Sequence, residues 1–393
     1  MKIVVLGGAG IIGRAIAADL AQDVDEVIVA DRDVKAAGEV AAGLGNSGDV
    51  QTVDVADPNS LELLIAGSDA CINSVNYYFN LDVMQACLKT GVPYIDLGGL
   101  FHKTRQQLKL DNDFKKEGLT AVLGMGSCPG VANVQAGWLA GMLDTIESVR
   151  IFNGSTVDRG DSLAAPYAIE TILDEISMPA MVFRDGGFLE RPPLGEEEHF
   201  LFPEPIGWST AHLSLHSEVA TIPLSFADQG IEECTFKITA FGYSEAAIGK
   251  LKFLAELGLA STEPIDIAGA SVKPRDMLIA ALRQLPMSED DRSAMGHKAV
   301  VTVIKGRIDA QPVELKAETM GGPVDGAADG AGKRLVSGPA AIIARWLGDG
   351  RLNQPGVWPP ELIIEPEPFF EELAQRGFAT RLARSEPIAI PPK

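Results

Sequence analysis

The chain has 393 residues, of which 46% are hydrophobic and 22% are charged, a composition typical of a globular protein long enough for two or more domains. The formal net charge of −21 argues against a nucleic-acid partner or an anionic membrane surface, because both attract basic proteins. No uninterrupted apolar run reaches the roughly 18 residues of a membrane span, and the first residues lack the cleavage site of a signal peptide.

The N-terminal residues predict a dinucleotide-binding loop. Residues 2–6 are a β-branched apolar run typical of a buried strand, and an alanine-rich helical pattern extends to residue 20. The intervening glycines allow a tight turn, close approach of backbone to a pyrophosphate, and packing of the helix on the strand. We therefore expect the loop to bind phosphates at a helix N-terminus, through Gly8, Gly10, Ile11, Ile12 and Gly13.

The next apolar run carries the residues expected to choose the cofactor. Residues 27–30 lead directly to Asp31, at the spacing that the dinucleotide motif requires. A carboxylate at this strand end accepts hydrogen bonds from the adenosine ribose and repels the 2′-phosphate of NADP, which favours NAD. Arg32 is suited to bind that phosphate, so NADP remains an alternative.

The following pattern alternates strands and helices and predicts a doubly wound parallel sheet. Strands are expected at 50–55, 70–75, 92–97 and 119–124, and helices at 34–44, 61–66, 80–90 and 108–116. The ends of two of these strands supply further cofactor candidates. These are Asp54 and Val55 beside adenine, and Asn73, Ser74 and Val75 beside ribose and nicotinamide.

A change of pattern predicts a second domain after residue 125. Period-two alternation and hairpin turns from residue 148 onward indicate a largely antiparallel sheet, with strands expected at 149–156, 181–183, 220–224, 234–241, 299–306 and 313–319. Helices at 167–176, 246–257 and 275–285 are expected to cover one of its faces. The fold class is therefore α/β: a Rossmann domain at 1–125, an α+β domain with a mixed sheet at 126–338, and C-terminal helices at 339–393 that return to the Rossmann domain.

Several motifs, in this order and spacing, resemble the saccharopine dehydrogenase family over nearly the whole chain. They are Gly8-Ala9-Gly10-x-x-Gly13, Asn73-Ser74-Val75 with Tyr77-Tyr78, Pro93-Tyr94-Ile95-Asp96, Gly126-x-x-Pro129-Gly130-x-x-Asn133, and Gly338-Pro339-Ala340-Ala341 followed by Gly356-Val357-Trp358-Pro359-Pro360-Glu361. The resemblance implies hydride transfer between a nicotinamide and a carbon that bears an amine or imine, with a small amino-acid or amine substrate. It also implies that the second domain holds this substrate and mediates a homodimer.

Three residues are candidate catalytic groups. Asp96 ends a predicted parallel strand beside the cofactor, where a carboxylate would stabilise an iminium, although it also fits a turn before Gly98. His102 belongs to the residue type that moves protons near neutral pH, but a solvated loop histidine explains it equally well. Cys128 precedes a helix predicted at 131–142 and is either a reactive thiol or a packing residue. It replaces the aspartate of the Asp-Pro-Gly turn that many family members carry, which weakens this position as a partner for an ammonium.

The candidate substrate residues come from both predicted domains. Tyr77 and Tyr78 occupy the region that faces substrate in the resembled family, and core packing is the alternative for one of them. Asn133 is placed to donate to substrate or to cap its helix. A substrate carboxylate requires a guanidinium, for which Arg159 is preferred over Arg184.

Two further sets bear on metals. His212, His216 and Glu218 fall on one face of a predicted strand, where a substrate-pocket or dimer-contact role of this set is favoured over a zinc site, with His212 as the substrate-binding candidate. Cys71, Cys87, Cys128 and Cys234 form no C-x-x-C pair, which is typical of free thiols in a reducing compartment. We therefore expect a cytoplasmic protein that binds no metal.

The leading hypothesis is an NAD-dependent oxidoreductase with chemistry like that of lysine 6-dehydrogenase. An NADP-linked saccharopine or carboxynorspermidine dehydrogenase is the first alternative, supported by Arg32. A non-catalytic NAD-binding sensor is the second alternative, because a fold alone does not assign a function.

Overall fold

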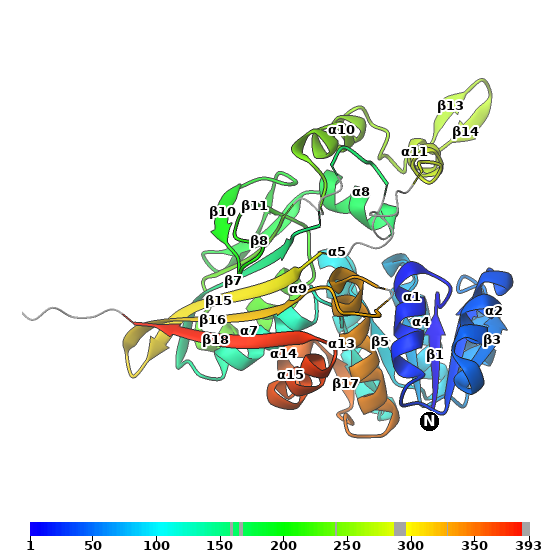
Figure 1. Cartoon of the computed structure of the whole chain (residues 1–393), viewed down its shortest axis with the longest axis horizontal. Helices are drawn as coiled ribbons and strands as arrows, with labels where there is room; N and C mark the ends of the chain where they lie inside the picture. The colour runs from blue at the N-terminus through cyan, green and yellow to red at the C-terminus, as the bar shows by residue number, and fades with distance from the viewer. Residues whose placement is uncertain (158–159, 165–167, 240–241, 287–295, 328, 387–393) are drawn as a thin grey trace, which may run out of the picture.

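A computed structural model describes residues 1–157, 160–164, 168–239, 242–286, 296–327 and 329–386. Two large sheets organise these residues (Figure 1), one parallel and near the N-terminus, the other mixed and continuing to the C-terminal strand. Across the described residues, no helix is long and apolar enough to cross a membrane.

The parallel sheet has the strand order β3-β2-β1-β4-β5-β6-β17, and its first six strands follow the Rossmann order. Its strands are β1 (Lys2–Leu6), β2 (Glu26–Asp31), β3 (Gly48–Thr52), β4 (Ala70–Asn73), β5 (Tyr94–Asp96), β6 (Thr120–Val122) and β17 (Gly356–Trp358). The central strands are buried along almost their whole length, which explains their continuous apolar runs.

The connections between these strands are helical. They are α1 (Ile11–Leu20), α2 (Val34–Gly43), α3 (Pro58–Ile65), α4 (Asn80–Thr90), α5 (Leu100–Gln107) and α6 (Asp111–Glu117), with short 3₁₀ segments η1 (Gly45–Ser47), η2 (Tyr77–Phe79) and η3 (Leu108–Leu110). The predicted doubly wound α/β domain is confirmed, although α5 was not predicted and β3 ends before Asp54.

The mixed sheet has nine strands in its described part, and its order β10-β11-β12-β7-β15-β16-β18 is extended by β8 and β9. Its strands are β7 (Thr145–Ser155), β8 (Ala180–Arg184), β9 (Gly187–Arg191), β10 (Glu198–Leu201), β11 (Trp208–Leu213), β12 (Glu233–Ile238), β15 (Lys298–Ile308), β16 (Gln311–Gly321) and β18 (Phe378–Ser385). Within it β7 and β12 pair in parallel and the other neighbours are antiparallel, which confirms the predicted mixed, largely antiparallel sheet.

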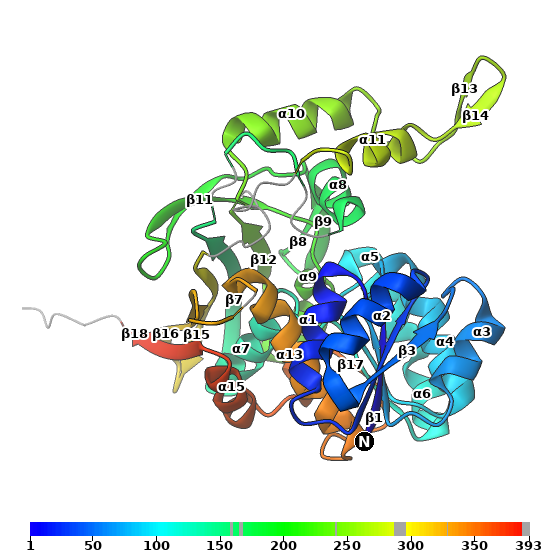
Figure 2. The ribbon, with the colours of Figure 1, turned by 45° about the vertical axis from the view of Figure 1, so that its right-hand side comes forward.

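Helices surround the mixed sheet and extend beyond it (Figure 2). They are α7 (Val131–Ala140), α8 (Ile169–Ser177), α9 (Glu218–Ser225), α10 (Glu245–Glu256) and α11 (Pro274–Leu282), with η4 (Ala227–Gln229) after α9. A small hairpin of β13 (Ile265–Ile267) and β14 (Ala270–Val272) projects from the end that carries α11. The strand predicted at 220–224 is wrong, because this segment lies in α9, where residues 218–223 are all buried and the apolar run therefore carries no helical period.

The C-terminal residues connect the two sheets. Helix α13 (Ala331–Gly348) packs beside α1, and β17 joins the parallel sheet. After α14 (Pro360–Ile363) and α15 (Pro366–Gln375), β18 pairs with β16 of the mixed sheet. The segment 339–393 thus contributes strands as well as the expected helices, and its first helix begins before residue 339; the division into domains stays a prediction.

Candidate functional site

A cavity of about 940 Å³ is lined by residues from both sheet regions. One part of its wall is the loop between β1 and α1, represented by Gly7, Gly10 and Ile11. Another part comes from α8, the segment before α9, and the first residue of β15. A volume of this size is typical of sites for small ligands and cofactors.

The glycine loop has the geometry of a phosphate cradle. Gly7 has a positive φ of 73°, and its carbonyl accepts the Gly10 N–H at 2.9 Å. A Cβ atom on Gly13 would lie 2.1 Å from the same carbonyl oxygen, so only glycine lets α1 approach the loop. Gly10 caps α1 without a side chain, which leaves the first N–H groups available to an anion.

The predicted loop residues divide into two sets. Gly10, Ile11 and Ile12 line the cavity, whereas Gly8 packs against Val29 and belongs, with Gly13, to the support of the turn. Gly7 lines the cavity too and was not predicted as a site residue. Its position directly before the glycine motif was the signal in the sequence that could have identified it.

The residues predicted beside adenosine come together at the cavity: Asp31, Arg32, Asp54 and Val55. One carboxylate oxygen of Asp31 accepts the Ala9 N–H at 3.2 Å and the other accepts the Asp33 N–H at 3.1 Å. These bonds hold the carboxylate at the strand end beside an exposed Arg32. The arrangement fits a ribose-binding carboxylate with a cation alongside it.

The end of β4 contributes two cavity residues and one supporting residue. Ser74 and Val75 line the cavity, and the Ser74 hydroxyl donates to the Leu6 carbonyl at 2.5 Å. Asn73 is buried below them, donates to the Asn80 side chain at 2.9 Å and accepts the Val75 N–H. The predicted cofactor contact of Asn73 has no support from this geometry, because its amide is used to shape the turn, and the contact stays a prediction.

Asp96 is a structural anchor and not a cavity residue. Its side chain is 0% exposed and accepts five hydrogen bonds, from Asn80, Tyr94, Gly98, Gln107 and Gly124. Burial raises the pKa of this carboxyl, while the five donors stabilise its ionised form. The geometry gives the predicted catalytic role of Asp96 no support, since its carboxylate is enclosed and lies outside the cavity wall, and the role stays a prediction.

Among the other predicted catalytic residues, one lies in the cavity. His102 is exposed on α5 and packs edge-on against Phe101, outside the cavity wall, so its catalytic role is not supported by the geometry. Cys128 is half-buried and lines the cavity. Burial, reinforced by the charge of Glu218, raises the pKa of the Cys128 thiol, which favours the neutral form over a reactive thiolate.

Tyr77 and Tyr78 line the cavity and connect the parallel-sheet region to α8. Both hydroxyls donate to the same carboxylate oxygen of Asp174 at 2.7 Å, and Arg275 contacts its other oxygen at 2.7 Å. Burial beside this carboxylate raises the pKa of Tyr78 to about 12 and that of Tyr77 further. The two tyrosines therefore act as neutral donors at neutral pH.

The remaining predicted substrate residues lie elsewhere. Asn133 is buried, accepts the Gly130 N–H at 3.0 Å and donates to Glu361 at 2.8 Å, so the geometry supports the capping alternative, and the substrate role stays a prediction. His212 lies in β11 outside the cavity wall, which corrects its assignment to the pocket. Arg159 lies outside the described residues, as do the predicted element ends at residues 167 and 241.

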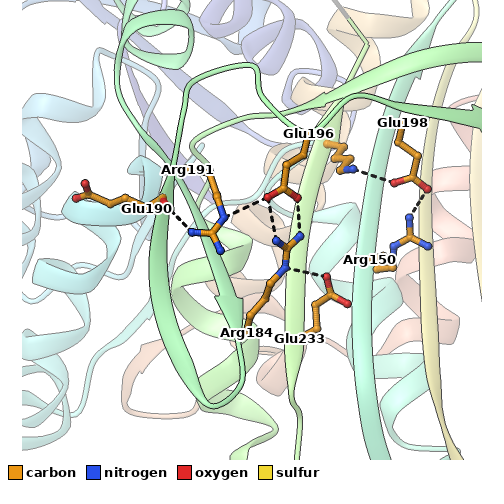
Figure 3. A network of polar contacts seen from close by, with 8 residues as sticks. Arg150, Arg184, Glu190, Arg191, Glu196, Glu198 and Glu233 are labelled. Atoms are coloured by element: carbon orange, nitrogen blue, oxygen red, sulfur yellow. Dashed lines mark hydrogen bonds and ion pairs between the residues drawn. The ribbon is translucent and has the colours of Figure 1, made fainter.

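Arg184 takes part in a network of ion pairs on the mixed sheet (Figure 3). Its guanidinium donates two hydrogen bonds to Glu196, at 2.6 and 2.9 Å, and a third to Glu233 at 3.2 Å. Arg150 and Lys237 pair with Glu198 in the same region. These contacts use Arg184 within the sheet, away from the cavity.

A titratable cluster lies in and behind the cavity wall, and only part of it was identified from the sequence. His216 and Glu218 were singled out, and the structure joins the His216 Nδ1 atom to a Glu218 carboxylate oxygen by a 2.8 Å hydrogen bond, with the His216 ring stacked on Phe236 at 3.8 Å. Lys298 and Glu175 line the same cavity as His216 and were missed. They come from β15 and α8, far along the chain from His216, so no local sequence pattern indicated them.

The cluster reaches the parallel-sheet region through Ser217. The Ser217 hydroxyl accepts the Gly99 N–H at 3.3 Å and donates to the Leu100 carbonyl at 3.2 Å. This contact seats the start of α9 against α5 and so brings His216 to the cavity. His216 and Glu218 do not share a strand face with His212, because β11 ends at Leu213 and α9 begins at Glu218.

Burial and charge set the protonation of this cluster. Burial alone favours a neutral imidazole, but the carboxylates of Glu218 and Glu175 outweigh it and raise the pKa of His216. Burial lowers the pKa of Lys298. The cavity thus holds two proton-carrying groups whose pKa values are shifted in opposite directions, that of His216 upward and that of Lys298 downward.

Comparison with known proteins gives matches along almost the whole chain. The family model of the saccharopine dehydrogenase NADP binding domain matches residues 3–122, and that of the saccharopine dehydrogenase C-terminal domain matches residues 126–378. A carboxyaminopropylagmatine dehydrogenase of Synechocystis is 27% identical, with 96% of each chain covered. A carboxynorspermidine synthase of Vibrio cholerae is 25% identical, covering 97% of this chain and 96% of the relative.

A solved structure has the same architecture. The saccharopine dehydrogenase (L-Glu forming) of Saccharomyces cerevisiae superposes with a TM-score of 0.71 at 17% identity, covering 97% of this chain and 99% of the yeast chain. The family matches confirm the predicted domain that binds a nicotinamide dinucleotide. The description of the matching model as an NADP binding domain agrees with the alternative cofactor, NADP, for which Arg32 was the supporting residue. The glycine cradle, the two-sheet fold and both family models together place this chain in the saccharopine dehydrogenase family.

Proposed function

We propose that the protein is a nicotinamide-dependent dehydrogenase of a secondary amine that carries both a carboxylate and a cationic amine chain. Two relatives matched over at least 96% of this chain are named for carboxyaminopropylagmatine and carboxynorspermidine. The observation that carries the proposal is a single cavity that joins the glycine loop to Cys128, His216 and Lys298. Such a cavity brings a cofactor site and a proton-transfer site within reach of one substrate.

The chain's own groups supply binding and orientation on the cofactor side. The N–H groups at the start of α1 bind phosphates, and Asp31 binds ribose hydroxyls. When bound, a nicotinamide dinucleotide accepts or supplies a hydride. Ser74 and Val75, at the end of the next strand in the sheet, border the place where a substrate and the cofactor would meet.

On the substrate side, the cavity offers groups for both charges of such an amine. Lys298 supplies an ammonium for the carboxylate, and Glu175 of α8 supplies negative charge toward a cationic chain. Tyr77 and Tyr78 supply neutral hydroxyl groups near α8. Arg159, predicted as the carboxylate partner, stays a prediction.

The test is the appearance of reduced cofactor by absorbance with carboxynorspermidine, carboxyaminopropylagmatine, saccharopine or L-lysine, each assayed with NAD and with NADP. We expect turnover of a carboxylate-bearing secondary amine and little turnover of L-lysine, which has primary amines only. Turnover of L-lysine alone would instead support the chemistry of lysine 6-dehydrogenase. Tight cofactor binding without turnover of any of the four amines would contradict the proposal and favour the non-catalytic sensor.

Two further expectations from the sequence remain proposals. The homodimer is tested by light scattering of the purified protein, for which a mass near 42 kDa, that of one 41.6 kDa chain, would contradict it. The cytoplasmic location stays a prediction.

A further inference from the structure

We propose that His216, held by Glu218, is the group that takes the proton from the substrate nitrogen during oxidation and returns it during reduction. This inference rests on the proposed function, because it assigns a role within that reaction. It requires a ring that is fixed, that reaches the cavity, and that has one nitrogen left for substrate.

The ring is fixed on two sides. Its Nδ1 is hydrogen-bonded to Glu218 at 2.8 Å, and its face stacks on Phe236 with an interplanar angle of 16°. The neighbouring Ser217 is tied to α5 through three hydrogen bonds, which fixes the backbone beside it. Because Nδ1 is used by Glu218, Nε2 is the nitrogen left for a ligand in the cavity that His216 lines.

Glu218 is suited to support a cationic imidazole. Its side chain is 0% exposed, and Oε1 has no hydrogen-bond partner among the described residues. A buried carboxylate without a cation is costly, so protonation of His216 relieves this cost when the proton arrives from substrate. Glu218 is therefore a positioning residue, in the arrangement by which a buried carboxylate orients a catalytic histidine.

The step balances as follows. A secondary ammonium gives one proton to Nε2, the freed lone pair forms the C=N bond, and the hydride leaves the carbon for the nicotinamide. The product is an iminium, which keeps the positive charge, and His216 carries the released proton as imidazolium. Reduction reverses each of these transfers.

Other charged groups surround the imidazole and must enter the test. Glu218 belongs to α9 and Glu175 to α8, while Lys298 of β15 opposes protonation and Cys128 precedes α7. Lys298 is the rival proton carrier because it lines the same cavity. A Lys298→Met variant therefore accompanies the histidine variant.

The experiment measures kcat for oxidation against pH in the wild-type protein and in His216→Gln, with His199→Gln as the matched control. His199 is exposed on β10 and lies outside the cavity, so its variant should behave as the wild type. We expect kcat of His216→Gln to fall about 10²–10⁴-fold. The limb of the pH profile on which activity rises with pH should disappear, while the affinity for the cofactor should stay unchanged. The pKa read from this limb in the wild-type protein should lie above the ordinary pKa of histidine, since the surrounding carboxylates favour the protonated form of His216.

Glu218→Gln supplies a second readout if the histidine variant folds poorly. Without the carboxylate the imidazolium is less stable, so the rising limb should move to lower pH while turnover is partly kept. Two results would overturn the inference. One is turnover of His216→Gln within about threefold of the wild type. The other is a rising limb of the pH profile that Lys298→Met removes and Glu218→Gln does not move. Either result, with turnover by the wild-type protein, leaves the proposed function standing.

Discussion

At the residue scale, two aspartates show how the same side chain serves two purposes. Asp31 and Asp96 both end strands of the parallel sheet. Asp31 lines the cavity and accepts one backbone N–H on each oxygen, which leaves lone pairs for a ligand. Asp96 is enclosed by five donors, and its carboxylate has no lone pair left for a ligand. Residue type and strand position were the same, and only the neighbours differ.

Cofactor choice gives the residue-scale prediction. Asp31→Ser should lower the ratio of kcat/KM with NAD to kcat/KM with NADP by about 10–100-fold. The variant loses a hydrogen bond from ribose to a charged carboxylate, which contributes about 1.5–3 kcal/mol, and it loses the negative charge that repels a 2′-phosphate. The measurement is kcat/KM with each cofactor at saturating amine. Asp54→Ser is the matched control, since Asp54 lines the same cavity from the neighbouring strand end and should change the ratio little. An unchanged ratio in Asp31→Ser would contradict the ribose role.

At the element scale, α1 depends on its glycine contact with the preceding loop. The helix begins directly at the cavity, with a glycine cap and no acidic side chain in its first turn. The close approach of Gly13 to the Gly7 carbonyl sets how the helix leaves the sheet. This close backbone contact therefore helps to position the N–H groups that are proposed to bind phosphate.

A pair of identical substitutions tests this contact. Gly13→Ala places a Cβ 2.1 Å from a backbone oxygen, which should cost about 1–3 kcal/mol and weaken dinucleotide binding at least tenfold. Gly38→Ala, in α2, meets nothing within 4 Å and should stabilise the protein by about 0.4–1 kcal/mol with unchanged binding. Thermal unfolding and calorimetric titration with NAD measure the two effects. Equal behaviour of the two variants would refute the role given to Gly13.

At the scale of the whole molecule, a buried ion pair connects the parallel-sheet region with the helices beyond the mixed sheet. Asp174 of α8 accepts hydrogen bonds from Tyr77 and Tyr78 of η2 and pairs with Arg275 of α11. Asp174 and Arg275 are 3% and 6% exposed, so their pairing is well protected from water. A second ion pair, between Glu170 and Arg283, joins the same two helices closer to solvent.

These two ion pairs predict different losses of stability. Arg275→Met leaves the buried Asp174 without its cation and should lower the free energy of unfolding by about 3–5 kcal/mol. Arg283→Met removes an ion pair whose cation is 58% exposed and should cost less than about 1 kcal/mol. Urea unfolding followed by circular dichroism gives both values. A loss in Arg275→Met as small as in Arg283→Met would show that the buried pair does not stabilise the junction.

The C-terminal connection is a second feature of the whole molecule. Arg376 donates to both carboxylate oxygens of Asp19 at 2.6 and 2.8 Å, which ties the end of α15 to α1. Strand β18 then continues into the mixed sheet (Figure 1). The last described residues therefore hold the two sheets together.

The sequence by itself determined the Rossmann sheet, the glycine cradle, the cavity placement of Asp31, Arg32, Asp54 and Val55, and the family, because each follows from short local motifs and from their order along the chain. Only the tertiary structure decided that Asp96, Asn73 and Asn133 support the site from below, since their side chains bond to other elements of the fold: Asn73 to α4, Asp96 to the Gly124 N–H after β6, and Asn133 to Glu361 of α14. It also decided the pairing of β17 and β18, and the meeting of His216 with Lys298. Nonlocal pairing and burial choose the partners of a polar side chain, and neither leaves a local pattern in the sequence.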